Sequence, residues 1–363
     1  MELAALDIRY ATLELQRLVG AKVEKVVQSD TEKRDLLFTL YKPGLDRKVL
    51  LRFILPSLVC THDTKPDSYP QIPPGFAMFL RKYLTKLTRV EQAGFDRIIK
   101  LYFEGKTGSW TLVAEFLPPG NMILIDADGK IKNLLENQVY KDRSLRGGLP
   151  YAQPPTAFNL TTATDEGIAQ RICAALKQSV AAALATALGL GGVYAEEACA
   201  RARVDKACTE LTADGIHALV RAVRDLLAQE IVPHKDASRV YPFRLESRAT
   251  APCPESSFLA AIGASLGVSA PSAPSSKPKK SKAQAMLDAQ EANLATLHAV
   301  AAEEQRKADR IYEEYSLIKE VIDTAQAARR EKNDVAHVLK RFAAVKRYDP
   351  ATATVEIELE DRA

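Results

Sequence analysis

The sequence is poor in the features that mark secreted, membrane-spanning and zinc-binding proteins. Its cysteines, at positions 60, 173, 199, 208 and 253, include no C-x-x-C pair, so neither a zinc site nor a disulfide framework is expected. No apolar run approaches the roughly 18 residues of a transmembrane helix. The amino terminus has neither the basic flank nor the apolar stretch of a signal peptide. We therefore expect a cytoplasmic protein with no membrane partner.

Sequence signatures of enzymes are also scarce. The five histidines are isolated and lack the spacing of metal ligands. There is no G-x-x-x-x-G-K phosphate loop and no H-E-x-x-H zinc-protease helix. The sequence therefore predicts a protein that is not an enzyme and uses neither a cofactor nor a metal.

The composition is ordinary for a globular protein, but the charge is unevenly distributed. The 363 residues are 47% apolar and 26% charged, which suffices for two or more domains with cores. Between Tyr41 and Lys106, twelve lysines and arginines stand against six acidic residues, so this segment exceeds the net charge of +4 of the whole chain. Such a segment indicates either a polyanionic partner or a well-solvated surface of strands.

The first 163 residues are predicted to form the first part of an α+β domain. Helical patterns cover residues 8–19 and 75–84, the second after a double proline that favours a helix start. Several short segments have the composition typical of strands. These segments are residues 21–29, 35–41, 49–54, 97–103, 110–117, 122–126 and 131–135.

Residues 164–229 are rich in alanine and are predicted to be a helical module. Within it, Gly189, Gly191 and Gly192 resemble the turn of a helix-hairpin-helix. Glycines there allow a tight turn whose backbone N–H groups can receive a phosphate. The alternative is a plain turn between two closely packed helices. Residues 230–266 return to a mixed pattern, with a strand expected at 239–245.

Residues 267–282 are predicted to be a flexible basic linker, because they are too poor in bulky apolar residues to build a core. Lys277, Lys279 and Lys280 fall within it. They are candidates for RNA contacts, and a solvated linker explains them equally well.

One long helix is predicted for residues 283–331, which contain neither glycine nor proline. Its apolar residues follow a heptad pattern that indicates a first coiled-coil arm over 283–345. A short strand-like tail is expected at 346–363. At about 1.5 Å per residue the helix would extend roughly 70 Å, and its apolar seam needs a partner. The two rows of the seam are positions 287, 294, 301, 308, 315, 322 and positions 290, 297, 304, 311, 318, 325.

A charged pair interrupts an otherwise apolar strand pattern. Arg97 shares its parity with Ile99, Leu101 and Phe103, so it heads the row predicted to face the core. A guanidinium cannot lose its charge, so it requires an anionic partner or a bound phosphate. Asp96 points to the opposite face. The alternatives are a salt bridge at the strand end and a ligand site.

Several motifs in order extend this signal. They are Leu6-Asp7-Ile8-Arg9-Tyr10, the segment 73–84, the segment 94–103, the segment 115–126 and Tyr151-Ala152-Gln153-Pro154-Pro155. Together they resemble the amino-terminal half of the NFACT family, which includes RqcH, NEMF and proteins labelled fibronectin-binding protein A. The resemblance covers residues 1 to about 335.

The resemblance implies an architecture. A glycosylase-like NFACT-N domain would be interrupted by the helix-hairpin-helix module and resume at 230–266, with a coiled-coil arm after it. Full-length members continue into a second arm and an NFACT-R domain, and we expect both to be absent here. Three alternatives are open: the sequence is a fragment and the missing part pairs with the seam, the seam pairs with a separate coiled-coil or NFACT-R polypeptide, or it pairs with a second copy.

The resemblance also implies a function in ribosome-associated quality control. Members bind large ribosomal subunits, with their rRNA, that still carry peptidyl-tRNA, and many recruit tRNA for template-free tailing of the stalled chain. The tRNA-positioning residues of the family map onto Asp7, Asp96 and Arg97. We expect Arg97 to meet a tRNA phosphate or an end nucleotide, and Asp7 or Asp96 either to orient Arg97 or to accept from an aminoacyl amine. The alternative is an Asp7–Arg97 bridge with a structural role.

Further cations and rival functions complete the expectations. The candidates for further phosphate contacts are Arg81, Lys82, Lys86 and Arg89, on or just beyond the short helix. A solvated helix face explains them equally well.

The NFACT-N domain resembles DNA glycosylases of the formamidopyrimidine type. Those enzymes need an amino-terminal proline and usually a four-cysteine zinc finger, and this chain has Glu2 and Leu3 instead. A scaffold that docks partners along the long helix is the nearer rival.

Overall fold

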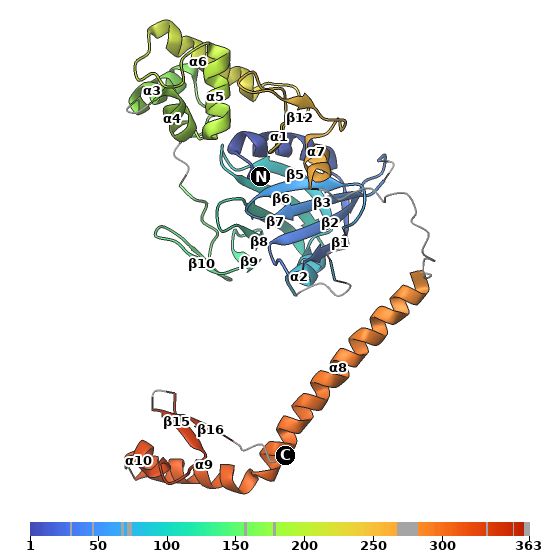
Figure 1. Cartoon of the computed structure of the whole chain (residues 1–363), viewed down its shortest axis with the longest axis vertical. Coiled ribbons are helices and arrows are strands. Elements are labelled where there is room, and N and C mark those ends of the chain that lie inside the picture. Colours follow the sequence, from blue (N-terminus) through green and yellow to red (C-terminus); the bar gives the residue numbers. More distant parts are fainter. Residues whose placement is uncertain are drawn as a thin grey trace. The chain divides into compact units, whose positions relative to one another are not determined.

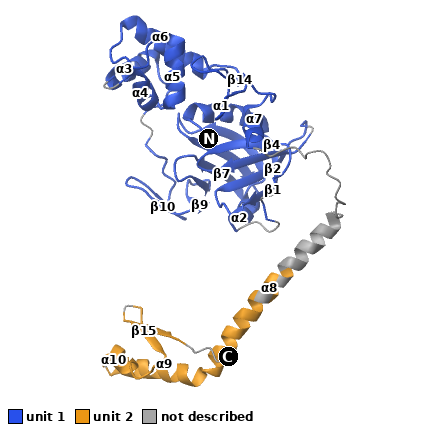
Figure 2. Cartoon of the chain, viewed as in Figure 1, with its two compact units in different colours: residues 1–272 blue, residues 273–363 orange. Residues whose placement is uncertain are grey.

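The computed structural model describes residues 1–29, 31–45, 47–66, 69–70, 75–155, 158–176, 179–266, 282–331, 333–350 and 352–358. The chain divides into two units, residues 1–272 and residues 273–363, coloured separately in Figure 2. Lys277, Lys279 and Lys280 lie outside the described residues.

A nine-stranded antiparallel sheet forms the frame of unit 1 (Figure 1). Its strand order, β4-β3-β2-β1-β5-β6-β7-β8-β9, is that of two meanders that meet at β1 and β5, where Lys22 pairs with Lys86. Together with the helices it gives the mixed architecture that the sequence predicts. The strands are β1 (Lys22–Gln28), β2 (Asp35–Tyr41), β3 (Val49–Ile54), β4 (Leu58–His62), β5 (Lys86–Gln92), β6 (Ile98–Gly105), β7 (Gly108–Glu115), β8 (Asn121–Ile125) and β9 (Ile131–Leu134).

The sequence predicted β2 and β3 with their observed bounds, but it missed β4 and β5. In β5 the register shifts between Leu87 and Arg89, and the bulge brings Leu87 and Val90 to the buried side. Leu87 and Val90 are three positions apart, so the two-residue period of buried side chains along a strand is lost. Lys86 and Arg89 therefore lie just beyond α2 (Gly75–Tyr83), as the sequence predicted, in a strand that the sequence did not predict.

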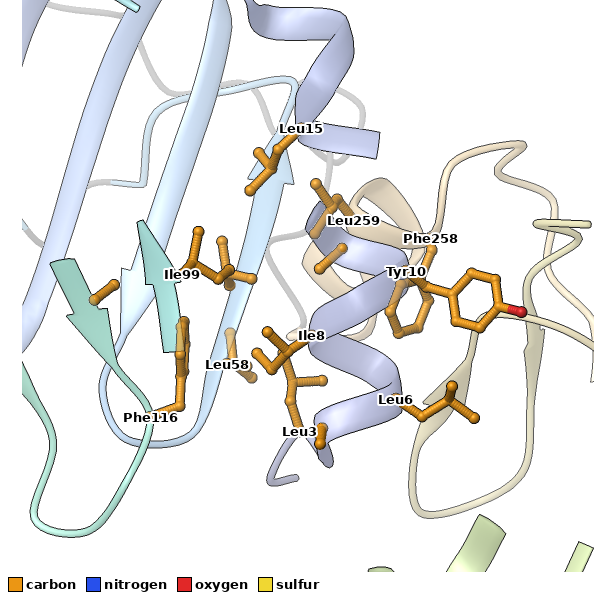
Figure 3. Close-up of a cluster of buried hydrophobic side chains, with 14 of the residues drawn as sticks. Leu3, Leu6, Ile8, Tyr10, Leu15, Leu58, Ile99, Phe116, Phe258 and Leu259 are labelled. Atoms are coloured by element: carbon orange, nitrogen blue, oxygen red, sulfur yellow. The ribbon is translucent and has the colours of Figure 1, made fainter. Parts of the chain in front are cut away.

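Helix α1 (Ala5–Leu15) packs between the sheet and a returning segment that ends in α7 (Phe258–Ser265). Figure 3 shows Ile8 pointing toward Leu58 and Phe116 of the sheet, whereas Tyr10 points away from the sheet. The Tyr10 hydroxyl donates to the Leu226 carbonyl at 2.6 Å. Burial of these large side chains contributes roughly 1.5–3 kcal/mol each, so α1 is held from both sides.

Unit 1 also contains a helical module and several short elements. After β9 come β10 (Gln138–Val139) and β11 (Ser144–Leu145), and an earlier helix, α2 (Gly75–Tyr83), packs against β1. The helical module comprises α3 (Asp165–Ala175), α4 (Val180–Ala187), α5 (Gly191–Ala202) and α6 (Ala213–Leu227). The chain then returns through a small sheet of β12 (His234–Lys235), β13 (Val240–Tyr241) and β14 (Ala251–Pro252). The predicted strand at 239–245 is thus only two residues long.

Unit 2 differs from the single long helix that was predicted. The helix is interrupted at Glu314, whose ψ of 18° leaves the α-helical region. Helix α9 packs against the short α10, and Val321 and Ala328 of α9 are buried. The continuous heptad pattern of the sequence does not reveal this packing of α9, so it does not predict the interruption. The elements are α8 (Lys282–Glu313), α9 (Tyr315–Arg330), α10 (Val335–Leu339), β15 (Val345–Asp349) and β16 (Thr354–Ile357).

Candidate functional site

A cavity of about 450 Å³ lies where separate parts of unit 1 meet. Its walls come from the chain leading into α1, the turn between β5 and β6, the turn between α4 and α5, and the returning segment. The volume falls in the range of small-ligand sites. The lining residues are Glu2, Leu3, Ala4, Ala5, Phe95, Asp96, Arg97, Leu117, Ala185, Gly189, Gly191 and Arg239.

Asp96 and Arg97 lie in this cavity, at the start of β6. Ile99, Leu101 and Phe103 belong to the main core, so Arg97 heads the core-facing row as the alternation predicted. Its backbone carbonyl accepts from Phe116 at 2.8 Å. Its side chain is 26% exposed and forms a long ion pair of 3.6 Å with Glu2, which is 61% exposed. The Arg97 backbone is therefore fixed to the sheet, while its guanidinium is held only loosely.

Asp7 is fully buried and does not line the cavity. Its carboxylate accepts from the Ala4 N–H at 2.7 Å, from the Tyr194 hydroxyl, and from Nη2 of Arg239 at 2.5 Å. The alternative of an Asp7–Arg97 bridge is wrong, because Asp7 pairs with Arg239 and Arg97 pairs with Glu2. Both Asp7 oxygens are thus occupied by protein donors.

The burial of this cluster shifts its ionisation. Burial raises the pKa of the Asp7 carboxyl, while the Arg239 charge and the bonds from Tyr194 and Ala4 act to lower it. Burial and the neighbouring carboxyl raise the pKa of Tyr194 well above its ordinary value, so its hydroxyl stays a donor. The Arg239 charge is thus the largest of the influences that favour the ionised form of Asp7.

Sequence reasoning missed Arg239 and Tyr194 as members of the site. Arg239 immediately precedes β13, and its guanidinium lies 5.2 Å from the centre of the Tyr241 ring. Tyr194 lies two residues after Gly192, the last glycine of the predicted turn. The sequence offered one weak signal for Arg239, namely a charged residue at the start of a short predicted strand.

The turn between α4 and α5 closes one wall of the cavity. Gly189 and Gly191 have φ values of +71° and +75°. Their positions lie against Phe95 and Ala4, at ordinary contact distances for an added Cβ. Gly192 does not line the cavity and has open space around it. The first two glycines are therefore required by backbone conformation, not by lack of space.

Replacing Gly191 with alanine is expected to destabilise unit 1 by about 1–2 kcal/mol, because the left-handed conformation is unfavourable for a residue with a Cβ. Gly192→Ala is the matched control, and it should be neutral or slightly stabilising because alanine favours the helix. Urea unfolding of both variants checks this. Equal losses in the two variants would contradict it.

The predicted cations of α2 and β5 are not among the residues that line the cavity. Arg81 is half-buried and its Nε donates to the Val26 carbonyl at 2.7 Å, and burial lowers the pKa of Arg81. Lys82, Lys86 and Arg89 are exposed. Lys86 pairs with Glu104 and Arg89 with Glu91.

One match to the G-x-S-x-G pattern, Gly263-Ala264-Ser265-Leu266-Gly267, has the wrong context for a nucleophile. Ser265 ends α7 and donates to the Ile262 carbonyl at 2.7 Å, whereas the nucleophile turn joins a strand to a helix.

Within the described residues, no group of three or more histidine, cysteine, aspartate or glutamate side chains is arranged to hold a metal ion. A search of the same residues also finds no helix with the length and apolar character needed to span a membrane.

The fold and the cavity define a class: a large antiparallel sheet carrying a helical module, with a cavity lined by acidic and basic side chains at their junction. The chain belongs to the NFACT family, because the family model for the NFACT N-terminal and middle domains matches residues 5–362.

Curated relatives agree with this assignment. The archaeal Rqc2 homolog aRqcH of Methanocaldococcus jannaschii is 28% identical over 93% of this chain and 54% of its own length. Human ribosome quality control complex subunit NEMF is 31% identical over 36% of this chain and 12% of its own length. The chain thus spans about half the length of the archaeal relative and less of the human one.

Solved structures share the fold. The amino-terminal part of the fibronectin/fibrinogen-binding protein of Streptococcus suis matches 71% of this chain and 97% of its own, with a TM-score of 0.57 and 19% identity. The fibrinogen binding protein of Staphylococcus aureus matches 70% of this chain and 96% of its own, with a TM-score of 0.57 and 21% identity.

Proposed function

We propose that this chain acts in ribosome-associated quality control, where it binds large ribosomal subunits that carry peptidyl-tRNA and positions tRNA for template-free extension of the stalled chain. Membership of the NFACT family and relatives named as ribosome quality control subunits support this role. The ribosome would form the peptide bond, so the chain itself would not be the catalyst. Its place of action would be the cytoplasm.

The observation that carries the proposal is the loosely held Arg97 guanidinium in the cavity wall. An exposed ion pair such as Arg97–Glu2 is worth about 0–1 kcal/mol, so exchanging Glu2 for a phosphate costs little. A guanidinium binds phosphate through two parallel N–H bonds. The carboxylates of Glu2 and Asp96, which share this wall, suit the cationic amine of an aminoacyl group.

Exposed cations outside the cavity would add affinity without specificity. Lys82, Lys86 and Arg89 are available to phosphates on the surface of unit 1, and each neutralised phosphate steepens the salt dependence of binding. We therefore expect tRNA binding that weakens strongly with salt and depends on Arg97 at any salt concentration.

The test is tRNA binding by the purified chain with Arg97→Gln, with Asp96→Asn, and with both changes. Arg97→Gln should weaken binding by about 1–3 kcal/mol, the value of one bidentate contact, or about 5-fold to 150-fold. Arg224→Gln is the matched control. Arg224 is 32% exposed and pairs with a 65% exposed Asp165, but it does not line the cavity. Equal affinities of these two variants would overturn tRNA positioning by the cavity.

A scaffold function is the second candidate, and exposed apolar side chains on α8 favour it. Leu294, Leu297 and Val300 are each more than half exposed, and such a row usually marks a contact surface. A scaffold would bind ribosomal subunits through α8 and leave tRNA binding unaffected by Arg97→Gln. Co-sedimentation with large subunits after Leu294→Glu and Leu297→Glu distinguishes it.

A further inference from the structure

Unit 1 contains three clusters in which a buried carboxylate holds an arginine and a tyrosine. In the first, Asp7 binds Arg239 and Tyr194. The other two are Asp35 with Arg52 and Tyr69, and Glu115 with Arg143 and Tyr151. All three carboxylates are buried, so the clusters share their chemistry and much of their stabilising role.

The Asp7 cluster differs in how its arginine is used. Arg52 and Arg143 each donate from two nitrogens to their carboxylate. Arg239 donates to Asp7 from Nη2, and its Nε is a buried donor with no partner among the described residues. Arg239 therefore lacks the two-nitrogen contact with its carboxylate that holds Arg52 and Arg143 in place.

The position of Arg239 also sets it apart from the other two arginines. Arg239 lines the same cavity as Arg97, although the two belong to different segments. Arg52 and Arg143 line neither this cavity nor the larger one of about 580 Å³ beside β3, β4 and α7. Of these three arginines, Arg239 is thus the one placed to meet a ligand.

We infer that Arg239 is a second ligand-contacting cation of the cavity, and that Asp7 is a positioning residue that acts through it. The inference rests on the proposed tRNA-binding function. Its ligand is a phosphate in an unpaired stretch of tRNA, because proteins read RNA mainly where bases are unpaired. Two guanidiniums from separate walls hold such a phosphate more specifically than either alone.

Asp7 fits a positioning role because it has no exposed surface. Its two oxygens already accept from Ala4, Tyr194 and Arg239, so a ligand amine has no access to it. The bond from Arg239 Nη2 to Asp7 already restricts the rotamers of the Arg239 side chain. Less conformational entropy is therefore lost when Arg239 binds a ligand. Removal of Asp7 should therefore weaken binding through Arg239 and have no effect where Arg239 is absent.

The experiment measures binding of the full chain to two hairpins, one from the acceptor end and one from the anticodon end of the same tRNA, and to a fully paired duplex of equal length. Arg239→Gln should weaken binding to at least one hairpin by about 5-fold to 150-fold and change duplex binding by less than about 2-fold. Asp7→Asn should weaken the same hairpin, and should add no further loss in the Arg239→Gln background.

Arg143→Gln is the matched control, since it disrupts a similar buried cluster that does not line the cavity. Arg239→Lys keeps the charge beside Asp7 and guards against a variant that fails to fold. It should fold and lose part of the hairpin affinity, because an ammonium lacks the planar fork. Unfolding followed through Trp110, the single tryptophan, verifies the folded state of each variant.

The two proposals fail separately. If Arg97→Gln loses binding while Arg239→Gln behaves like Arg143→Gln, Arg239 is structural and the inference is overturned, but the proposed function stands. If the wild-type chain binds neither tRNA nor the hairpins, both are overturned. Losses from Arg239→Gln that are equal for hairpin and duplex would also overturn the inference, because they indicate a general charge effect.

Discussion

Replacing Glu197 with alanine is expected to destabilise unit 1 by about 3–5 kcal/mol, the cost of breaking a buried, hydrogen-bonded charge pair. The Glu197 carboxylate is fully buried in α5. It accepts from the backbone N–H of Glu246 at 2.9 Å, from that of Ser247 at 2.8 Å, and from Nε of Arg201 at 2.7 Å. Alanine would leave these donors without their acceptor and weaken the connection of the helical module to the returning segment.

The adjacent Glu196 provides the control. It is partly exposed and pairs with Lys206 and Arg248 at the surface, so Glu196→Ala should cost less than about 1 kcal/mol. The measurement is urea unfolding followed by far-ultraviolet circular dichroism and Trp110 fluorescence. If the two alanine variants lost equal stability, the buried carboxylate would not have the anchoring role assigned to it.

Glu197 should also make stability depend on pH. Burial by itself would raise its pKa, but the backbone N–H groups of Glu246 and Ser247 and the Arg201 side chain hold the pKa of Glu197 below its ordinary value. A lowered folded-state pKa contributes stability that is present above the unfolded-state pKa of about 4.3 and is lost as the pH falls through the folded-state pKa. The wild type should therefore lose more stability than Glu197→Gln on acidification from neutral pH to below 4.

Replacing Glu14 with alanine is expected to have a similar effect, about 3–5 kcal/mol, at the other end of the returning segment. Glu14, in α1, is buried, and its carboxylate caps the start of α7. It accepts from the backbone N–H of Phe258 at 2.7 Å, from that of Leu259 at 2.9 Å, and from the Ser257 hydroxyl at 2.9 Å. A negative charge there is also favoured by the helix dipole.

Glu24→Ala is the control for Glu14, because Glu24 forms a more exposed pair with Lys48. Ser257→Ala should cost about 1 kcal/mol as the loss of an N-cap. Unfolding of the single and double variants gives the coupling energy. Since Glu14 and Ser257 bind each other, the two losses should not be additive. Additive losses would show that Glu14 stabilises the chain in another way.

Together, Asp7, Glu14 and Glu197 explain how the cavity keeps its shape. Each carboxylate receives donors from a segment far away in the sequence, so each fixes one junction between α1, the helical module and the returning segment. Any of these losses is expected to move Arg239 relative to Arg97 and weaken tRNA binding along with stability.

The local sequence pattern was enough to predict many strands of the sheet. β2 and β3 are short, mostly apolar runs that pair with each other in regular register, and the sequence predicted their bounds. The bulge in β5 shifts the buried positions from a spacing of two to a spacing of three, so the same method missed that strand.

The sequence by itself determined the charged pair Asp96–Arg97, the glycine turn and the family motifs, because each is a short pattern with a local physical cause. It could not determine the partner of Asp7. Arg239 lies 232 residues away in the sequence, and many arginines were equally possible until the fold brought one of them to the carboxylate. The tertiary structure also decided that Asp7 lies behind the cavity while Arg239 faces it, because burial depends on packing of segments whose order in the sequence says nothing about their distance.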